Sequence, residues 1–164
     1  MDRLQLSIAT EYRHGFAEAT QEIRLAVNGR DLADIARDVE REVGADRKLA
    51  GKYRPLAEPH FQAGRNRLKD HLLGAARSSL SAGPADKTVM LVCADCGEPA
   101  CWPLMARIEV EEKTVTWTDF EQPKRPEWDL SGLGPFEFDR KQYEGALADA
   151  ATSLTADRWR DSQT

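Results

Sequence analysis

Three cysteines lie within nine residues of the chain, in the stretch Cys93-Ala-Asp-Cys96-Gly-Glu-Pro-Ala-Cys101. Cysteine thiolates bind zinc, which takes four cysteine, histidine or carboxylate ligands in a tetrahedron. The C-x-x-C-G order is typical of zinc knuckles, because the glycine lets the backbone turn so that its amides can point at a thiolate sulfur. We therefore expect Cys93, Cys96 and Cys101 to be metal ligands, with zinc as the cofactor.

A fourth ligand has to come from another part of the chain. The sequence contains three histidines, none of them after position 71. We take His71 as the candidate fourth ligand, and a nearby carboxylate, Asp95 or Glu98, as the alternative. A single C-x2-C-x4-C pattern is less specific for zinc than a pair of C-x-x-C turns would be.

Two other interpretations of the cysteines stay open. Reduced cysteine is among the most buried residue types, so the three thiols can be packing residues. They can also serve a redox protein or a thiol-dependent enzyme, with a disulfide between Cys93 and Cys96 or one that involves Cys101. The glycine and prolines that follow Cys96 disfavour the helix on which a thioredoxin-like C-x-x-C depends.

A stretch of positive charge is the second chemical lead. Residues 47–77 hold eight basic and two acidic side chains, a pattern that could bind phosphate, nucleic acid or an acidic partner. The candidate anion-binding residues are Arg54, Arg65, Arg67 and Lys69. Because the whole chain carries a net charge of −5, we expect a solvated face here and do not expect nucleic acid as a partner.

Sequence signatures of common enzymes are missing from the chain. It contains no phosphate-binding G-x-x-x-x-G-K-[ST], no G-x-G-x-x-G, no G-x-S-x-G and no H-E-x-x-H. Cys101 and His71 could act as nucleophile and base, but no third group is identifiable. We therefore do not expect an enzyme.

The pattern of apolar residues predicts the elements that position these side chains. Alternation predicts strands, a continuous β-branched and apolar run at 88–93 predicts a buried strand, and helical spacing predicts helices that begin near Asp31 and Asp139. The expected strands cover residues 3–10, 23–27, 88–93, 104–110 and 114–120, with a short edge strand at 136–138. A further helix is expected over residues 61–77, within an otherwise irregular basic segment.

Together these elements predict one α+β domain over residues 1–164, with a mainly antiparallel sheet flanked by helices. Residues 1–45 form a strand-strand-helix unit, residues 46–86 the basic irregular or helical segment, and residues 87–160 a strand-rich half with a C-terminal helix. We expect Trp102, Trp117 and Trp128 to pack in the core, with a ligand pocket as the alternative.

The chain length and its hydropathy predict a soluble protein. The 164 residues suit one domain, and the longest apolar run, Val89–Ala94, is far shorter than the roughly 20 residues of a membrane span. The first residues have no continuous apolar stretch, so we expect no signal peptide, no membrane association and a cytoplasmic location.

Three stretches of the chain resemble a family of uncharacterised bacterial proteins. They are the turn CGEPACWPL (residues 96–104), the segment WTDFEQPKRPEWD (117–129) and the segment LGPFEFD (133–139). Lys124 stands where relatives are expected to carry histidine. The resemblance implies a bacterial protein but no activity, since none is established for that family.

From these observations we expect a non-catalytic binding or adaptor module whose cysteine turn, residues 93–103, is structural and is a candidate zinc site. Its partner is then a protein or a small ligand. The two alternatives are a thiol-dependent redox protein or enzyme, and a phosphate- or nucleic-acid-binding protein that acts through Arg47–Arg77.

Overall fold

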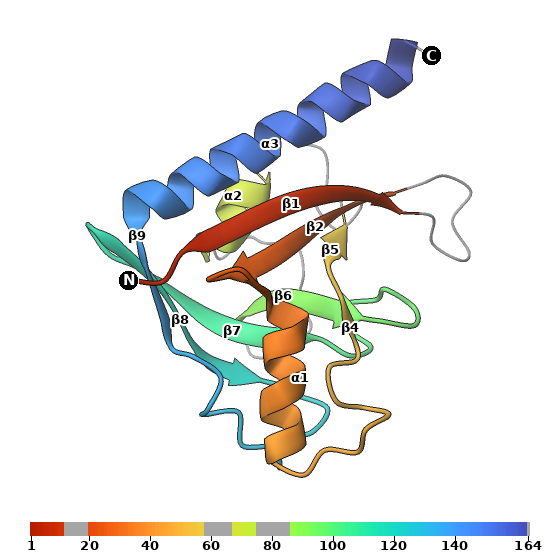
Figure 1. Ribbon diagram of the computed structural model, residues 1–164, viewed down its shortest axis with the longest axis vertical. Coiled ribbons are helices and arrows are strands. Elements are labelled where there is room, and N and C mark those ends of the chain that lie inside the picture. The colour runs from red at the N-terminus through yellow and green to blue at the C-terminus, as the bar shows by residue number, and fades with distance from the viewer. Residues whose placement is uncertain (12–19, 58–66, 75–85, 164) are drawn as a thin grey trace.

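The computed structural model of the chain describes residues 1–11, 20–57, 67–74 and 86–163, and it confirms an α+β fold (Figure 1). In chain order the elements are β1 (Leu4–Glu11), β2 (Thr20–Val27), β3 (Arg30–Asp31), α1 (Leu32–Glu42), β4 (Tyr53–Arg54), β5 (Leu56–Ala57), α2 (Arg67–Leu72), β6 (Thr88–Cys93), β7 (Leu104–Val110), β8 (Thr114–Glu121), β9 (Phe136–Asp139) and α3 (Arg140–Gln163). Within the described ranges the strands form a four-stranded and a five-stranded sheet.

The four-stranded sheet is built on the expected antiparallel pair β1 and β2, in which Leu4 lies opposite Val27. The turn after β2 uses positive φ angles at Asn28 and Gly29, which these two residue types adopt readily. It leads into the short strand β3 and then into α1, while β5 pairs with β2 further along.

The five-stranded sheet has the order β4-β6-β7-β8-β9. Its strand β6 is buried from Val89 to Cys93, because apolar side chains cover both of its faces. A ten-residue connection between β6 and β7 begins at Ala94 and contains Cys96 and Cys101. The expected strands 88–93 and 104–110 therefore have the predicted bounds, and the expected edge strand at 136–138 is confirmed as β9.

The segment between α1 and β6 differs from the expectation of an irregular basic stretch. It contains two strands of two residues each, and β4 joins the five-stranded sheet while β5 joins the four-stranded one. The helix expected over 61–77 is shorter in the described part of the chain, where α2 covers Arg67–Leu72. Its expected ends, Phe61 and Arg77, lie outside the described residues.

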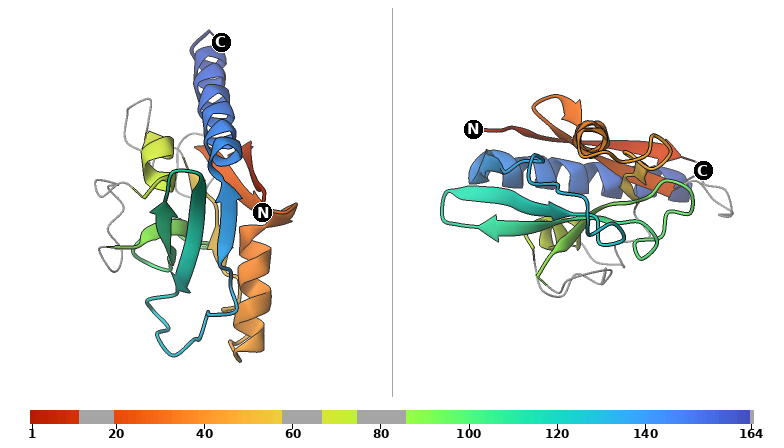
Figure 2. Two further views of the ribbon diagram at one scale, coloured as in Figure 1. Left: turned by 90° about the vertical axis from the view of Figure 1, so that its left-hand side faces the viewer. Right: turned by 90° about the horizontal axis from the view of Figure 1, so that it is seen from below.

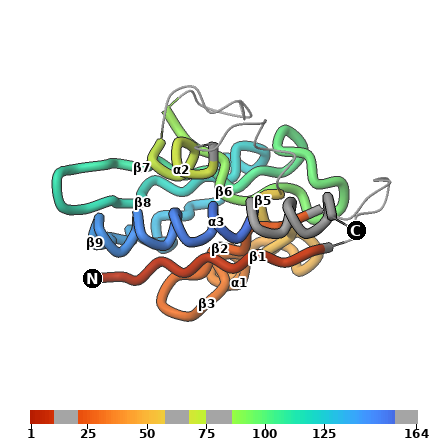
Figure 3. Tube along the Cα trace, turned by 90° about the horizontal axis from the view of Figure 1, so that it is seen from above, coloured from red at the N-terminus to blue at the C-terminus, as the bar shows by residue number. Residues whose placement is uncertain are grey.

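The two sheets share one apolar core, which α3 covers (Figure 2). Leu25 comes from the first sheet, Trp117 and Phe138 come from the second, and Tyr143 and Leu147 come from α3. Figure 3 shows α3 between β1 on one side and β7 and β8 on the other. None of the helices in the described part of the chain has the length and hydropathy of a membrane span.

Candidate metal centre

The structure brings the three cysteines together at the end of β6. Their Sγ atoms all lie within 4.8 Å of one another. Cys93 is the last residue of the strand and is buried, whereas Cys96 and Cys101 are exposed. The chain turns back after Cys93 because the Gly97 amide donates a hydrogen bond to the Cys93 carbonyl at 2.9 Å. Gly97 has a φ of 71°, a conformation that favours glycine at this position.

This spacing of sulfur atoms fits a metal ion. Zinc–sulfur bonds of about 2.3 Å in a tetrahedron place two sulfur atoms about 3.8 Å apart. The cluster therefore needs to contract by about 1 Å at most. Small rotations of the two exposed side chains, Cys96 and Cys101, can supply that change.

Hydrogen bonds prepare one of the thiols for metal binding. Burial raises the pKa of the Cys93 thiol, but hydrogen bonds from the backbone amides of Cys96 and Asp95 and from the Cys96 and Cys101 side chains outweigh it, so the pKa is lowered. Hydrogen bonds to Cys96 and Cys93 raise the pKa of the Cys101 thiol to about 11. Of Cys93 and Cys101, Cys93 is therefore the one whose surroundings favour loss of the thiol proton.

A lysine lies beside the cluster. Lys52 Nζ is 2.6 Å from Asp95 Oδ2, and the Lys52 carbonyl accepts a hydrogen bond from the Ala94 amide at 3.2 Å. The hydrogen bond to Asp95 raises the pKa of Lys52, and the charges of Cys93 and Cys101 add to the effect. The ammonium group is thus held beside the turn by Asp95, close enough for its charge to interact with the cysteines.

The candidate fourth ligand, His71, lies elsewhere. Its Nε2 atom is 2.6 Å from the carbonyl oxygen of Val89, four residues before Cys93, and its side chain is buried. Among the residues that the structure describes, no other histidine or carboxylate shares the grouping of the three cysteines. Of the nearby carboxylates, Asp95 is paired with Lys52 and Glu98 is exposed. The other two histidines, His14 and His60, lie outside the described residues.

An aromatic group adjoins the cysteine turn. Trp102 follows Cys101 directly and packs edge-on against Trp128, with 5.8 Å between ring centroids. The Arg125 guanidinium lies 5.1 Å from the centre of the Trp102 ring. Arg125 and Trp128 also line an open cavity of about 520 Å³ between the end of β8 and the loop that leads to β9. Through Trp102 the turn therefore contacts two of the residues that line the cavity, although Trp102 itself is not part of the lining.

Trp117 belongs to the core, as expected. Its side chain is fully buried, and its Nε1 donates a hydrogen bond to the Tyr143 hydroxyl at 2.9 Å. The Tyr143 hydroxyl in turn donates to the carbonyl of Leu72. This chain of hydrogen bonds ties β8 to α3 and α2, and the ring does not line the cavity.

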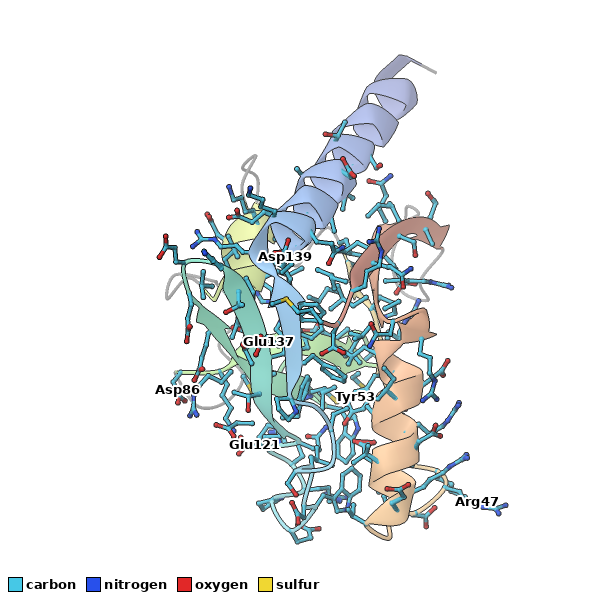
Figure 4. The ribbon with its side chains drawn as sticks, turned by 60° about the vertical axis from the view of Figure 1, so that its left-hand side comes forward. Arg47, Tyr53, Asp86, Glu121, Glu137 and Asp139 are labelled. Atoms are coloured by element: carbon cyan, nitrogen blue, oxygen red, sulfur yellow. The ribbon has the colours of Figure 1, made fainter. Side chains whose placement is uncertain are left out.

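The candidate anion-binding residues do not gather into one site among the described residues. Arg54 lies on β4, where its Nε is 3.4 Å from the carboxylate of the buried Glu22. Lys69 is exposed on α2. Arg65 and the side chain of Arg67 lie outside the described part of the chain. At the start of the basic stretch, Arg47 points away from the fold (Figure 4).

A buried polar network that the sequence did not predict lies next to the cluster. Tyr53, which pairs with Cys93 across β4 and β6, faces α1 (Figure 4) and donates a 2.5 Å hydrogen bond to Glu40. Glu40 also accepts a 2.7 Å hydrogen bond from the Gly51 amide, and Gln122 donates to the Tyr53 hydroxyl at 3.2 Å. One feature of the sequence indicates that Glu40 is buried: it continues the helical face of Leu32 and Ala36, at a spacing of four residues.

The carboxylates at the end of β8 form ion pairs with Arg107 of the neighbouring strand β7 and with Lys87, which precedes β6. Arg107 pairs with Asp119 and with Asp86, while Lys87 lies 3.5 Å from Glu121. Figure 4 shows Asp86 and Glu121 at this edge of the molecule.

No protein-family model, curated protein or solved structure matches this chain.

Proposed function

We propose that this protein binds zinc through Cys93, Cys96 and Cys101, and that the metal is structural in a non-catalytic binding module. One observation carries the proposal. Three sulfur atoms lie within 4.8 Å of one another, on a turn whose amides point at the first of them. A structural zinc has four protein ligands, so the fourth ligand would be a side chain outside this grouping.

The metal would hold the connection between β6 and β7 in one conformation. Its two exposed ligands, Cys96 and Cys101, lie on a loop with few buried apolar side chains, so metal bonds supply the order that packing does not. The same bonds keep Trp102 against Trp128 and Arg125. We infer that this face, with the adjoining cavity, takes a protein or small-ligand partner in the cytoplasm.

Metal analysis tests the proposal. Protein purified without chelator is expected to hold about one zinc ion per chain, with thiols that react only after chelation. Cys96→Ser and Cys101→Ser should each lower zinc affinity at least about tenfold. Substitution of a residue that only hydrogen-bonds to a metal ligand already causes a loss of about that size, and these variants remove a ligand itself. Glu112→Gln, an exposed change in the turn between β7 and β8, is the control and should keep the zinc. Protein without metal, with three freely reacting thiols, would contradict the proposal.

A further inference from the structure

The three sulfur atoms differ in their access to solvent. Cys93 is 4% exposed, whereas Cys96 and Cys101 are both exposed, and Cys96 shares the closed turn with Cys93. We propose that this centre is a peroxide-sensitive switch, in which Cys96 and Cys93 form a disulfide and the metal is released. This inference rests on the proposed zinc site and adds a mode of regulation to it.

The backbone already places these two cysteines at a distance that suits a disulfide. The hydrogen bond from the Gly97 amide to the Cys93 carbonyl closes a five-residue α-turn, and one such helical turn places the Cα atoms of its first and fourth residues, Cys93 and Cys96, about 5 Å apart. Disulfides require Cα atoms about 4.4–6.8 Å apart. Side-chain rotation is then enough to bring the sulfur atoms from within 4.8 Å to bonding distance, and β6 need not move.

The reaction balances with a hydroperoxide as the oxidant. The exposed Cys96 thiolate attacks one oxygen of hydrogen peroxide, so that an S–O bond forms, the O–O bond breaks and hydroxide leaves. The Cys93 thiolate then attacks the Cys96 sulfur, so that the S–S bond forms and a second hydroxide leaves. Two thiolates lose two electrons, and the peroxide, with two protons, becomes two waters. A dithiol reductant reverses the change by thiol–disulfide exchange.

Oxidation therefore removes two of the three ligands at once. Cys101 alone cannot retain zinc, because a structural site needs several protein ligands. Since Trp102 follows Cys101 and packs on Trp128 and under Arg125, release of the turn changes the wall of the cavity. The metal centre would thus transmit the oxidation state to the proposed binding face.

The test treats the zinc-loaded full chain with hydrogen peroxide. It measures released zinc with a colorimetric chelator, free thiols by titration, and the linkage by mass spectrometry. Cleavage before Asp95 and after Glu98 puts the three cysteines on three separate peptides, so the linked pair is read directly. We expect release of the bound zinc, loss of two thiols per chain, a Cys93–Cys96 link and recovery of zinc binding after dithiothreitol.

Variants of the zinc-free protein show which cysteines form the disulfide. Cys101→Ser should still form the disulfide, whereas Cys96→Ser should not. Zinc retained under peroxide, a Cys96–Cys101 link, or oxidation to sulfinic acid without a disulfide would overturn this inference and leave the zinc site standing. A chain that never binds zinc would overturn the proposed function, and metal release with it.

Discussion

Glu40 is a carboxyl group enclosed by the fold. It lies on the buried face of α1 and accepts hydrogen bonds from the Gly51 amide and the Tyr53 hydroxyl. Burial raises the pKa of Glu40 above its ordinary value of 4.5, and these two hydrogen bonds, which favour the charged form, offset only part of the effect. The folded protein thus holds a proton that the unfolded chain releases.

This difference gives a pH dependence of known sign. Because the folded-state pKa of Glu40 is raised, its contribution to the free energy of unfolding is complete below pH 4.5 and is lost as the pH rises through the folded-state pKa. The loss is about 1.4 kcal/mol for each pH unit over which only the folded protein keeps the proton. Glu40→Gln should remove it, so that urea unfolding at about pH 5 and about pH 8 differs less than in the wild type.

A matched substitution on the same helix completes this experiment. Glu42 is exposed at the end of α1, and Glu42→Gln should leave the wild-type pH dependence in place. Parallel pH profiles for the Glu40→Gln variant and the wild type would show that the buried carboxyl does not titrate in this range.

At the level of elements, the side chain of Gln142 ties α3 to the first strand. Its Oε1 accepts a hydrogen bond from the Leu4 amide at 3.0 Å, and its Nε2 donates to the Leu4 carbonyl at 2.7 Å. The helix start is itself fixed, because the Asp139 carboxylate accepts a hydrogen bond from the Gln142 amide at 3.1 Å. The glutamine therefore acts on the edge of β1 as a neighbouring strand would.

Removal of this side chain should loosen the contact between the two elements. Gln142→Ala loses two hydrogen bonds to a buried backbone and should lower the free energy of unfolding by about 1–2 kcal/mol. Alanine favours helix, so a loss cannot be assigned to helix propensity. Amide hydrogen exchange at Leu4 should become faster than in the wild type. Lys141→Ala, an exposed change one residue earlier, is the control, and equal exchange in both variants would contradict the assignment.

The elements that the sequence predicted are those with several residues of regular pattern. A continuous apolar run identified β6, alternation identified β7 and β8, and the spacing of the cysteines predicted their cluster. The strands β4 and β5 escaped because two residues carry no periodicity and owe their conformation to the partners β6 and β2. For the same reason the division into two sheets could not be predicted, since pairing joins segments far apart in the chain.

The positions of side chains that contact distant segments could not be predicted from the sequence either. The place of His71 depends on how α2 packs against β6, which no local pattern encodes, and it puts the imidazole on the Val89 carbonyl. The network of Glu40, Tyr53 and Gln122 likewise joins three separate segments. Such contacts arise from tertiary packing, while the cysteines could be predicted because one turn holds all three.

At the scale of the whole molecule, the continuity of the core decides how the chain unfolds. Leu25 of the four-stranded sheet and Leu104 of the five-stranded sheet are both buried in the same cluster, and α3 covers both sheets. Neither sheet can expose its apolar face without exposing that of the other. The described part of the chain should therefore behave as one cooperative unit, in keeping with a single domain over residues 1–164.

Two substitutions, one in each sheet, make this expectation testable. Leu25→Ala and Leu104→Ala should each lower the free energy of unfolding by about 2–5 kcal/mol, and Val110→Ala, at an exposed site on β7, by less than about 0.5 kcal/mol. Tryptophan fluorescence, to which the buried Trp117 contributes together with Trp102, Trp128 and Trp159, reports on the second half of the chain, whereas far-ultraviolet circular dichroism reports on all elements. If the sheets unfolded separately, Leu25→Ala would shift the dichroism transition ahead of the fluorescence transition. A shared core requires both transitions to move together in both variants, because loss of a side chain on either side weakens the same cluster.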